Sequence, residues 1–496
     1  MKKTYILLII TLISFASKAQ DKKISLSLDD VIDIASEKSL EEFKNENIYL
    51  SSYWEYRYFK ADRLPLLSLG TNPFDFYRYR SKEHNFQTGK EEFYLEEYLN
   101  SDLSMSLKQK VGLTGGTIFL NSDIEMVKNM GDDKSTSYQA TPISIGYSQD
   151  LNGYNAMRWK AKIEPMKFEK AKKTFIQSKE VLSISTADKF FDLVSAQIEL
   201  KIAENNLSSA DTLYKIGQGR FQVGTVTQDE LLSLQLNLLQ SKQDLIKAQS
   251  TLQRAQSSLN SFLSLDKKTI VNCIVPEKIP SIKVRADEAV GKATENNPDM
   301  LSHLQELLEQ DQSVAKAKAE AGFSTSIYAL YGLNQTSEKF SNVYNDPEKS
   351  QLFQVGFSIP LLDWGKRRGS YLMAKSDREV AIARIKQERI EFEQQVYQDV
   401  IEFNLQAEQV YNAAMADTVA QKGYDVTLQR FLIGKVDVVK LNIARSDLET
   451  ARSRYVEELR DYWNYYYRIR MWTLYDFVKG ETLSAEFDKI LQKQKP

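Results

Sequence analysis

The chain has 496 residues, with 65 basic against 67 acidic side chains and a formal net charge of −2. This balance excludes the basic face typical of nucleic-acid-binding proteins, so nucleic acid is not an expected partner. One cysteine, Cys273, excludes a disulfide framework and a cysteine-based zinc site, and two histidines leave little material for metal binding or general-base catalysis. We therefore expect no metal site, no cofactor, no catalytic residues and no enzymatic activity.

The first nineteen residues have the pattern of a secretory signal peptide. Lysines at positions 2 and 3 form its positive start, residues 5–15 form its apolar stretch, and Ser17-Lys18-Ala19 provides a small-residue cleavage site. No cysteine follows the apolar stretch, so we expect the mature chain to begin at Gln20 without a lipid anchor. No later window is long and apolar enough for a transmembrane helix, so any membrane crossing is expected to use strands.

A helical pattern begins each half of the mature chain. DDVIDIASEKSLEE, at residues 29–42, matches DEAVGKATENNPDM, at residues 287–300, with an offset of 258 residues. The helices that follow these segments are expected to end near Pro65 and Phe323. The match indicates an internal duplication.

Short stretches of alternating polarity with many aromatic residues follow each helical pattern. They lie at residues 64–70, 142–149, 324–333 and 352–359. This alternation is typical of membrane β-barrel strands, and also of a soluble sheet. About four strands per chain are too few for a barrel, because the smallest side-chain-filled barrels need about eight. Since open strand edges cannot exist in lipid, membrane strands of this kind predict an oligomer.

The strand region of the first half contains an insertion. Beyond it the offset between the halves falls from 258 to 210 residues, which places about 48 extra residues between about 71 and 142. The extra sequence alternates around Gly115-Gly116, as hairpins do. It forms either a long extracellular loop with its own hairpin or two further strands, which would widen a shared barrel to eighteen strands. Because two further strands would break the correspondence with the second half, the sequence favours the loop or hairpin.

A long helix, a short turn and a second long helix complete each half. ISIGYSQDL (143–151) matches FQVGFSIPL (353–361), and RFQVGTVTQDELLSLQ (220–235) matches RFLIGKVDVVKLNIAR (430–445), both at the offset of 210. The few prolines and glycines before each turn allow a helix of roughly 60 residues.

We therefore expect two structural repeats, residues 20–265 and 286–470, separated by a linker. Each repeat is ordered helix, strands, long helix, turn, long helix. The turns of the two helical hairpins are expected near 217–226 and 431–437.

The helix after the first turn carries a coiled-coil seam. Leucines recur every seven residues from Leu231 to Leu259, and a second line of leucine, small and aromatic residues follows three residues on, from Leu234 to Phe262. The seam predicts closely packed helices. It leaves open an ordinary helical bundle, or a structural coiled-coil protein of the cell envelope without a lumen.

The signal peptide, the duplicated strand–helix halves and the paired VGT and IGK turns together resemble the TolC-like outer-membrane efflux proteins, over about residues 25 to 475. The resemblance implies an α+β membrane protein that is a homotrimer in the outer membrane of a Gram-negative bacterium. Four strands per chain would close a twelve-stranded transmembrane β-barrel surrounded by lipid. A periplasmic α-helical barrel of coiled-coil hairpins would continue it, with an equatorial belt formed by residues 266–285 and 471–496.

The same resemblance implies a function and partners. The chain would be the outer-membrane exit duct of a tripartite efflux or type I secretion system, passively conducting solutes from an inner-membrane pump through a periplasmic adaptor (membrane fusion) protein. In the family, the hairpin turns dock the adaptor. Carried over by position, the docking residues are Arg220, Phe221, Val223, Gly224, Thr225, Arg430, Phe431, Ile433, Gly434 and Lys435.

The channel entrance is where the sequence departs from the family pattern. The family commonly places acidic residues six and nine positions after the second glycine, where this chain has Lys440 and Ile443. Asp437 lies only three positions after that glycine, and in the first half Glu230 lies six positions after Gly224, beside Asp229. One hypothesis is that alternating Glu230 and Lys440 side chains of three copies form a ring of ion pairs that closes the entrance. The other is that these are solvated charges on helix faces.

Overall fold

The computed structural model describes residues 23–85, 89–131, 134–276, 279–359 and 361–492. The predicted signal peptide lies outside these residues. The chain divides into two compact units, each of which draws on both repeats. The helical unit contains Met1–Leu50, Lys172–Met300 and Arg389–Pro496, and the sheet unit contains Ser51–Ala171 and Leu301–Glu388.

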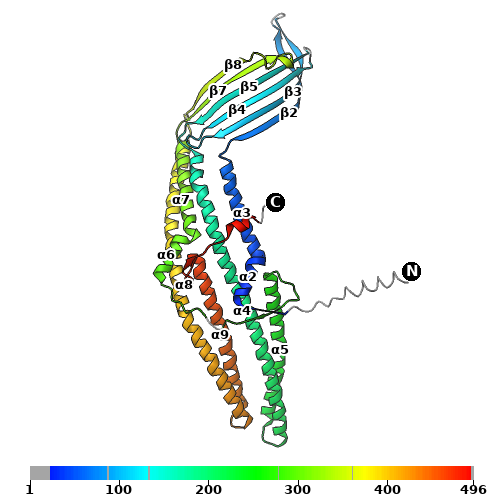
Figure 1. The fold of residues 1–496 in the computed structure, drawn as a ribbon, viewed down its shortest axis with the longest axis vertical. Coiled ribbons are helices and arrows are strands. Elements are labelled where there is room, and N and C mark those ends of the chain that lie inside the picture. Colours follow the sequence, from blue (N-terminus) through cyan, green and yellow to red (C-terminus); the bar gives the residue numbers. More distant parts are fainter. Residues whose placement is uncertain (1–22, 86–88, 132–133, 277–278, 360, 493–496) are drawn as a thin grey trace, which may run out of the picture. The chain divides into compact units, whose positions relative to one another are not determined.

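The centre of the sheet unit is one antiparallel sheet of six strands (Figure 1). Its strands are paired in chain order, and the β5–β7 pair joins the two repeats. A short 3₁₀ helix, Phe340–Asn342, lies between the last two strands. In sheet order the strands are β2 (Leu66–Asn85), β3 (Lys90–Lys110), β4 (Thr117–Asn129), β5 (Ser135–Asp150), β7 (Ser324–Ser337) and β8 (Glu348–Ser358).

The insertion is not a loop, and the expectation of four strands is wrong. The extra residues form β3 and β4, which lie between β2 and β5 in the sheet. β3 pairs with β2 from Leu66↔Lys108 to Asn85↔Lys90, so the inserted backbone satisfies its hydrogen bonds within the sheet. The correspondence between the halves survives because an even number of added strands returns the chain to the same end of the sheet. The repeat therefore fixes where the strand region begins and ends, and not how many strands it contains.

Helices precede and follow the strands in each repeat. The short pair α2 (Leu28–Lys38) and α3 (Leu40–Ala61) precedes β2, and the pair α6 (Ala286–Asn296) and α7 (Pro298–Ala321) precedes β7. After β5 and β8 come α4 (Ala156–Gln222) and α8 (Lys366–Leu432), each of 67 residues. The chain then reverses into α5 (Gln228–Phe262) and α9 (Val438–Thr473). Among the described residues, no helix combines the length and the apolar character needed to cross a membrane.

The predicted coiled-coil seam on α5 is buried at five of its ten positions and half-buried at the other five. Leu234, Leu238, Ser241, Ala248 and Leu259 are all less than one-tenth exposed. Small residues on the seam bring neighbouring helix backbones close together, which explains why serine and alanine alternate there with leucine.

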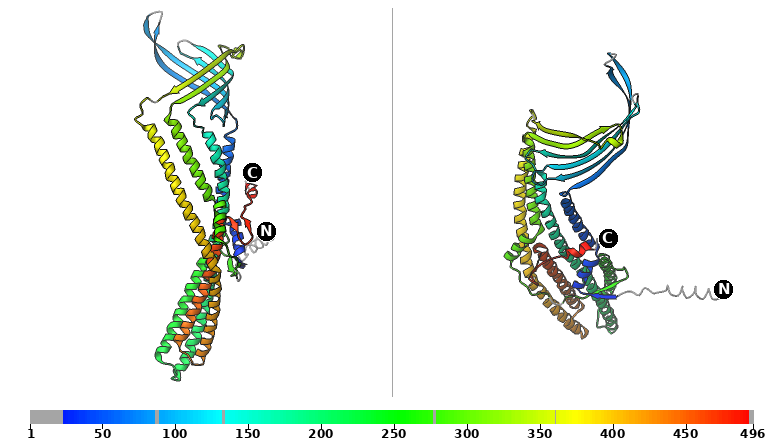
Figure 2. Two further views of the ribbon diagram at one scale, coloured as in Figure 1. Left: turned by 90° about the vertical axis from the view of Figure 1, so that its left-hand side faces the viewer. Right: turned by 45° about the horizontal axis from the view of Figure 1, so that its top comes forward.

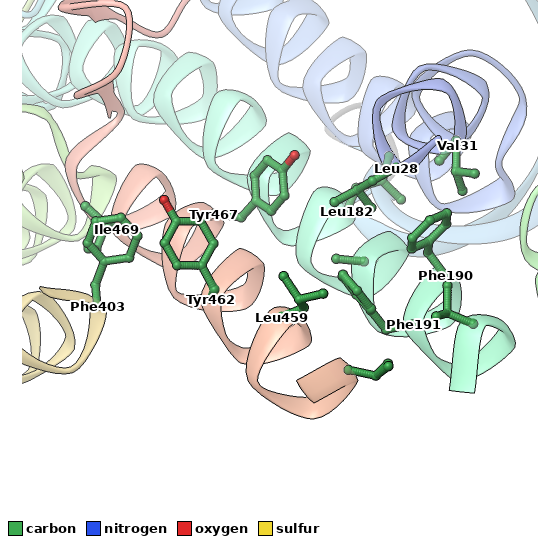
Figure 3. Packing of buried hydrophobic residues seen from close by; sticks show 14 of the residues in the cluster. Leu28, Val31, Leu182, Phe190, Phe191, Phe403, Leu459, Tyr462, Tyr467 and Ile469 are labelled. Atoms are coloured by element: carbon green, nitrogen blue, oxygen red, sulfur yellow. The ribbon is translucent and has the colours of Figure 1, made fainter. Parts of the chain in front are cut away.

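The largest core of the helical unit lies where helices from both repeats meet (Figure 3). Phe190 and Phe191 of α4 are fully buried, with their rings edge to face at 5.3 Å between centroids. Phe403 of α8 and Tyr462 of α9 pack at 5.3 Å, and the Tyr462 hydroxyl donates to the Pro280 carbonyl at 2.6 Å. Aromatic rings thus fill much of this core.

Short segments cover this core. Near the N-terminus, β1 (Lys23–Leu26) pairs in parallel with β6 (Ile270–Cys273), and Val271 of β6 is buried in the core. Near the C-terminus, β9 (Tyr475–Asp476) and β10 (Glu481–Thr482) form a small hairpin, followed by α10 (Phe487–Gln492). Of these elements, β6, β9, β10 and α10 lie in the segments that the resemblance assigned to an equatorial belt, and β1 does not.

A buried charged cluster fixes the end of α9. The Arg470 guanidinium donates to Glu180 of α4 at 3.0 Å and to Asp476 of β9 at 3.2 Å. Burial raises the pKa of Glu180, and attraction to Arg470 offsets only part of this effect. Because the two carboxylates share one cation, the cluster ties three segments of the helical unit together.

Candidate functional site

The first helical hairpin reverses in a turn that requires glycine. The backbone N–H groups of Gly224 and Thr225 donate to the carbonyls of Phe221 and Arg220, at 3.0 and 2.9 Å. This pair of bonds is a Schellman motif, which satisfies the free carbonyls at the end of α4. Gly224 has φ +74°, a conformation that other residues adopt only with strain.

The second hairpin repeats the same turn. Gly434 has φ +72°, and the N–H groups of Gly434 and Lys435 donate to the carbonyls of Phe431 and Arg430, both at 2.9 Å. The match between the two sequences therefore reflects one backbone geometry used twice. Each turn presents its short apolar segment at the end of a hairpin.

Two of the predicted entrance residues, Glu230 and Asp437, act in helix capping through their side chains. Thr227 and Glu230 form a capping box at the start of α5, in which the Glu230 carboxylate accepts from the Thr227 N–H at 2.9 Å. The Asp437 carboxylate caps α9 by accepting from the Lys440 N–H at 2.8 Å. A hydrogen bond from the Thr227 side chain holds the pKa of Asp229 below its usual value.

No ion pair joins Glu230 to Lys440 within the described part of this single chain. The Glu230 carboxylate instead accepts from the Thr227 N–H in the capping box of the same chain. Within one copy of the chain, charges on helix faces are therefore enough to account for Glu230 and Lys440.

The ends of the two hairpins pack against each other (Figure 2). Leu213 and Leu234 from the first hairpin and Phe431 and Leu441 from the second form a small buried cluster. Arg220 adds a polar link, because its guanidinium donates to the Leu432 carbonyl at 3.0 Å. The two turns thus form one surface.

A groove of about 550 Å³ lies between the turns. Several predicted residues from both hairpins line it, which brings together equivalent parts of the two repeats that are far apart in the sequence. They are Arg220, Thr225, Glu230, Phe431, Gly434, Lys435, Asp437 and Lys440. The other predicted residues, Phe221, Val223, Gly224, Asp229, Arg430 and Ile433, lie outside its lining.

The apolar residues of the two turns differ in exposure. Val223 is 73% exposed and Ile433 is 66% exposed, whereas Phe431 is buried under the second turn. Phe221, at the position equivalent to Phe431, is 42% exposed. Phe431 is thus a packing residue, and Val223 and Ile433 form the apolar surface that a partner can reach.

A polar link between the hairpins was not predicted. Asn237 of α5 donates to Asn442 of α9 at 3.1 Å and accepts from Arg445 at 3.3 Å. Nearby, Asn206 of α4 and Glu449 of α9 are also hydrogen bonded. Asn237 is buried next to the heptad seam. The signal in the sequence for this buried polar contact is an asparagine among leucines.

Comparison with known proteins identifies the fold that carries these turns. Residues 110–264 and 289–470 match the family described as Outer membrane efflux protein. The chain belongs to this family. A search of curated proteins finds no significant match.

Solved structures of outer-membrane proteins, among them two outer-membrane channels, share the fold of this outer membrane efflux protein. The Campylobacter jejuni CmeC channel superposes with a TM-score of 0.65 at 16% identity, covering 94% of this chain and 88% of CmeC. VceC of Vibrio cholerae superposes with a TM-score of 0.61 at 12% identity, covering 92% of this chain and 96% of VceC. The open state of the Neisseria gonorrhoeae MtrE channel superposes with a TM-score of 0.58 at 13% identity, covering 90% of this chain and 88% of MtrE. The predicted family and fold class are therefore confirmed, and the function of the efflux protein at this level is export across the outer membrane.

Proposed function

We propose that this efflux protein is the exit duct of a tripartite efflux or type I secretion system, and that its hairpin turns dock a periplasmic adaptor. The observation that carries the proposal is the paired turn: two equal Schellman motifs present Val223 and Ile433 to solvent beside one groove. Small exposed apolar side chains next to a groove suit the helical hairpin of a partner. An inner-membrane pump would supply the energy for export, and the duct would provide only a path and a gate.

The proposed functional unit is a homotrimer. Leu232, Leu236, Leu239 and Ile246 form a stripe on α5 whose side chains are more than half exposed in the single chain. Their spacing of four, three and seven residues is that of a second coiled-coil seam. An apolar stripe of this kind is costly in water, so a second copy is its expected partner. The helices of three copies would enclose the periplasmic part of the duct, with residues 266–285 and 471–496 forming its belt.

The experiment on docking uses cells that depend on this duct. In the native bacterium with its own gene deleted, accumulation of a panel of fluorescent efflux substrates should rise, and the wild-type gene should restore export. A double variant, Val223→Asp with Ile433→Asp, should fail to restore export while still forming trimers in the outer membrane. Gln249→Glu, at an exposed position of α5 away from this stripe, is the matched control, and it should export normally. Normal export by the double variant would refute docking through the turns.

The gate is the second part of the proposal. In a trimer, Glu230, Asp229, Asp437 and Lys440 of all copies would surround the entrance, and Lys440 would provide cations to pair with Glu230 of a neighbouring copy. Conductance of Lys440→Ala in planar bilayers tests this. An increased current or a shift towards cation selectivity is expected, and unchanged current and selectivity would reject the ring of ion pairs.

A further inference from the structure

The six-stranded sheet has two open edges, β2 and β8, in the single chain. Neighbouring strands are antiparallel throughout, so an even number of strands leaves β2 and β8 running in opposite directions. The β8 edge of one copy can therefore pair with the β2 edge of the next in the same antiparallel pattern. Unpaired edges cannot remain in lipid, which makes copies of this chain the fitting partners for both edges.

One face of this sheet is apolar across all six strands, including the two inserted ones. The pairing register places Leu69, Met105 and Leu107 on the same face as Leu120, and Leu120 on the same face as Ile145. Through β5 the face continues to the second repeat. Its members there include Tyr331, Ala329, Phe353 and Val355.

Large apolar side chains on this face are exposed. Met105 of the inserted β3 is 48% exposed and Ile118 of the inserted β4 is 43% exposed, much like Ile145 at 52%. Phe353 on β8 reaches 71%. A band of this extent on a monomer marks a surface that another apolar phase covers.

The opposite face of the inserted strands is polar and charged. Asp102 and Ser104 of β3 lie directly across from Glu125 and Asp123 of β4. The face continues through Asn121 to Ser144 on β5. Carboxylates require water, so this face cannot be buried against lipid or in a dry core. A sheet with one apolar face and one water-exposed polar face has the pattern of a membrane barrel wall.

We propose that the inserted strands β3 and β4 are part of the membrane wall, and that three copies close an eighteen-stranded barrel through their β2 and β8 edges. The apolar face then contacts lipid, and the face with Asp102, Asp123 and Glu125 lines the lumen. This inference rests on the proposed trimeric duct. It goes beyond it in assigning a wider barrel than the twelve strands that the family resemblance implied.

The added strands change the dimensions of the outer mouth. For strands about 4.8 Å apart and tilted by about 40°, twelve strands give a barrel radius of roughly 12 Å and eighteen give roughly 18 Å. The cross-section thus more than doubles at the membrane.

Cysteine labelling in proteoliposomes tests the placement of β3. Met105→Cys and Ser104→Cys sample its two faces, and Phe353→Cys and Gln354→Cys are the matched pair on β8, a strand that lies in the wall whichever way the insertion is placed. Met105 and Phe353 each lie five residues before the end of their strand. The probe is a charged, membrane-impermeant maleimide, and the wild-type chain with Cys273 alone gives the background. Only variants that migrate as folded trimers before heating are compared.

The expected result is labelling of Ser104→Cys and Gln354→Cys, with at least tenfold slower labelling of Met105→Cys and Phe353→Cys. If Met105→Cys is labelled rapidly while Phe353→Cys stays protected, the inserted hairpin lies in water; the inference then fails and the trimeric duct stands. Rapid labelling of Phe353→Cys as well would show that the sheet is not in lipid, which overturns the proposed function itself. Electron cryomicroscopy of the unmodified trimer decides independently of any variant, because the wall contains either eighteen or twelve strands.

Discussion

At the scale of single residues, the two turn glycines have a role that their surroundings do not reveal. A Cβ added at Gly224 or Gly434 meets nothing within 4 Å, so the demand for glycine comes from the backbone alone. Gly224→Ala and Gly434→Ala place a side chain at positive φ and should each destabilise the hairpin end by roughly 1–2 kcal/mol. Thermal unfolding of the detergent-solubilised protein, followed by circular dichroism, measures the loss.

Gly219 provides the matched control for these substitutions. It lies in α4 just before the first turn, has open space around its Cα, and does not have positive φ. Gly219→Ala should therefore stabilise the helix, by up to about 1 kcal/mol. Equal effects of Gly219→Ala and Gly224→Ala would contradict the assignment of the turn geometry.

Cys273 should be unreactive in the folded protein. Burial against the α4 backbone raises the pKa of its thiol to about 12, and the thiolate is the reactive species. We expect negligible maleimide labelling of the native chain near neutral pH and complete labelling after denaturation. Rapid labelling of the native chain would mean that β6 separates readily from the core.

The sequence predicted the turn residues well, and their individual roles less well. The repeated Arg-Phe and Gly positions identified both turns, because a Schellman motif demands glycine at one fixed place. The equivalent residues Phe221 and Phe431 nevertheless differ in exposure, since only Phe431 packs against the other hairpin. Contacts between positions in different repeats leave no local pattern, which is why Asn237 and its partners went unpredicted.

At the scale of elements, the Arg470 cluster makes a prediction about stability. Arg470→Met leaves the Glu180 and Asp476 carboxylates buried without their shared cation, which should cost roughly 3–5 kcal/mol of unfolding free energy. Glu180→Gln is the control: Arg470 keeps Asp476, so the cost should be smaller, about 1–3 kcal/mol. Denaturant unfolding followed by tryptophan fluorescence gives both values, and a reversed order would refute the shared-cation description.

The same cluster should give the protein a pH dependence. The pKa of Glu180 is raised in the folded state, so the folded chain binds this proton more tightly than the unfolded chain. The stability that this proton contributes is therefore fully present below the ordinary glutamate pKa of 4.5, and it is lost as pH rises through the raised pKa of Glu180 in the folded chain. As pH rises above 4.5, wild type should therefore lose stability relative to Glu180→Gln. A constant difference between the two would contradict the raised pKa.

The elements show which sequence inferences are strong. Both long helices have 67 residues and begin at equivalent positions of the two repeats, as the duplication required. The inserted strands were harder to place, because alternation is shared by a water-exposed hairpin and a membrane strand. Only the pairing of Leu107 with Leu120 and of Leu120 with Ile145 shows that the apolar sides agree across the sheet. This agreement depends on the pairing register between strands, which the sequence of a single strand does not specify.

At the scale of the whole molecule, the exposed stripe on α5 predicts how assembly fails. Leu236→Glu places a charge in the proposed seam between copies and should reduce the fraction of trimer at least tenfold, because burying an unpaired carboxylate costs several kcal/mol. Analytical ultracentrifugation in detergent measures the fraction. Gln249→Glu adds the same charge at an exposed position of α5 about a quarter of the helix circumference away from the stripe, and it should leave the trimer intact. Full assembly of Leu236→Glu would remove this stripe from the interface.

The inserted hairpin leaves the pattern of the repeat undisturbed on either side of it. After the insertion, α4 and α8 begin at equivalent positions of the two repeats, and before it α2 and α6 do the same. A pair of strands can thus be gained or lost as a unit without altering the hairpins that we propose dock an adaptor. In the proposed barrel, the width of the outer opening could therefore change in evolution without any change to the proposed docking surface.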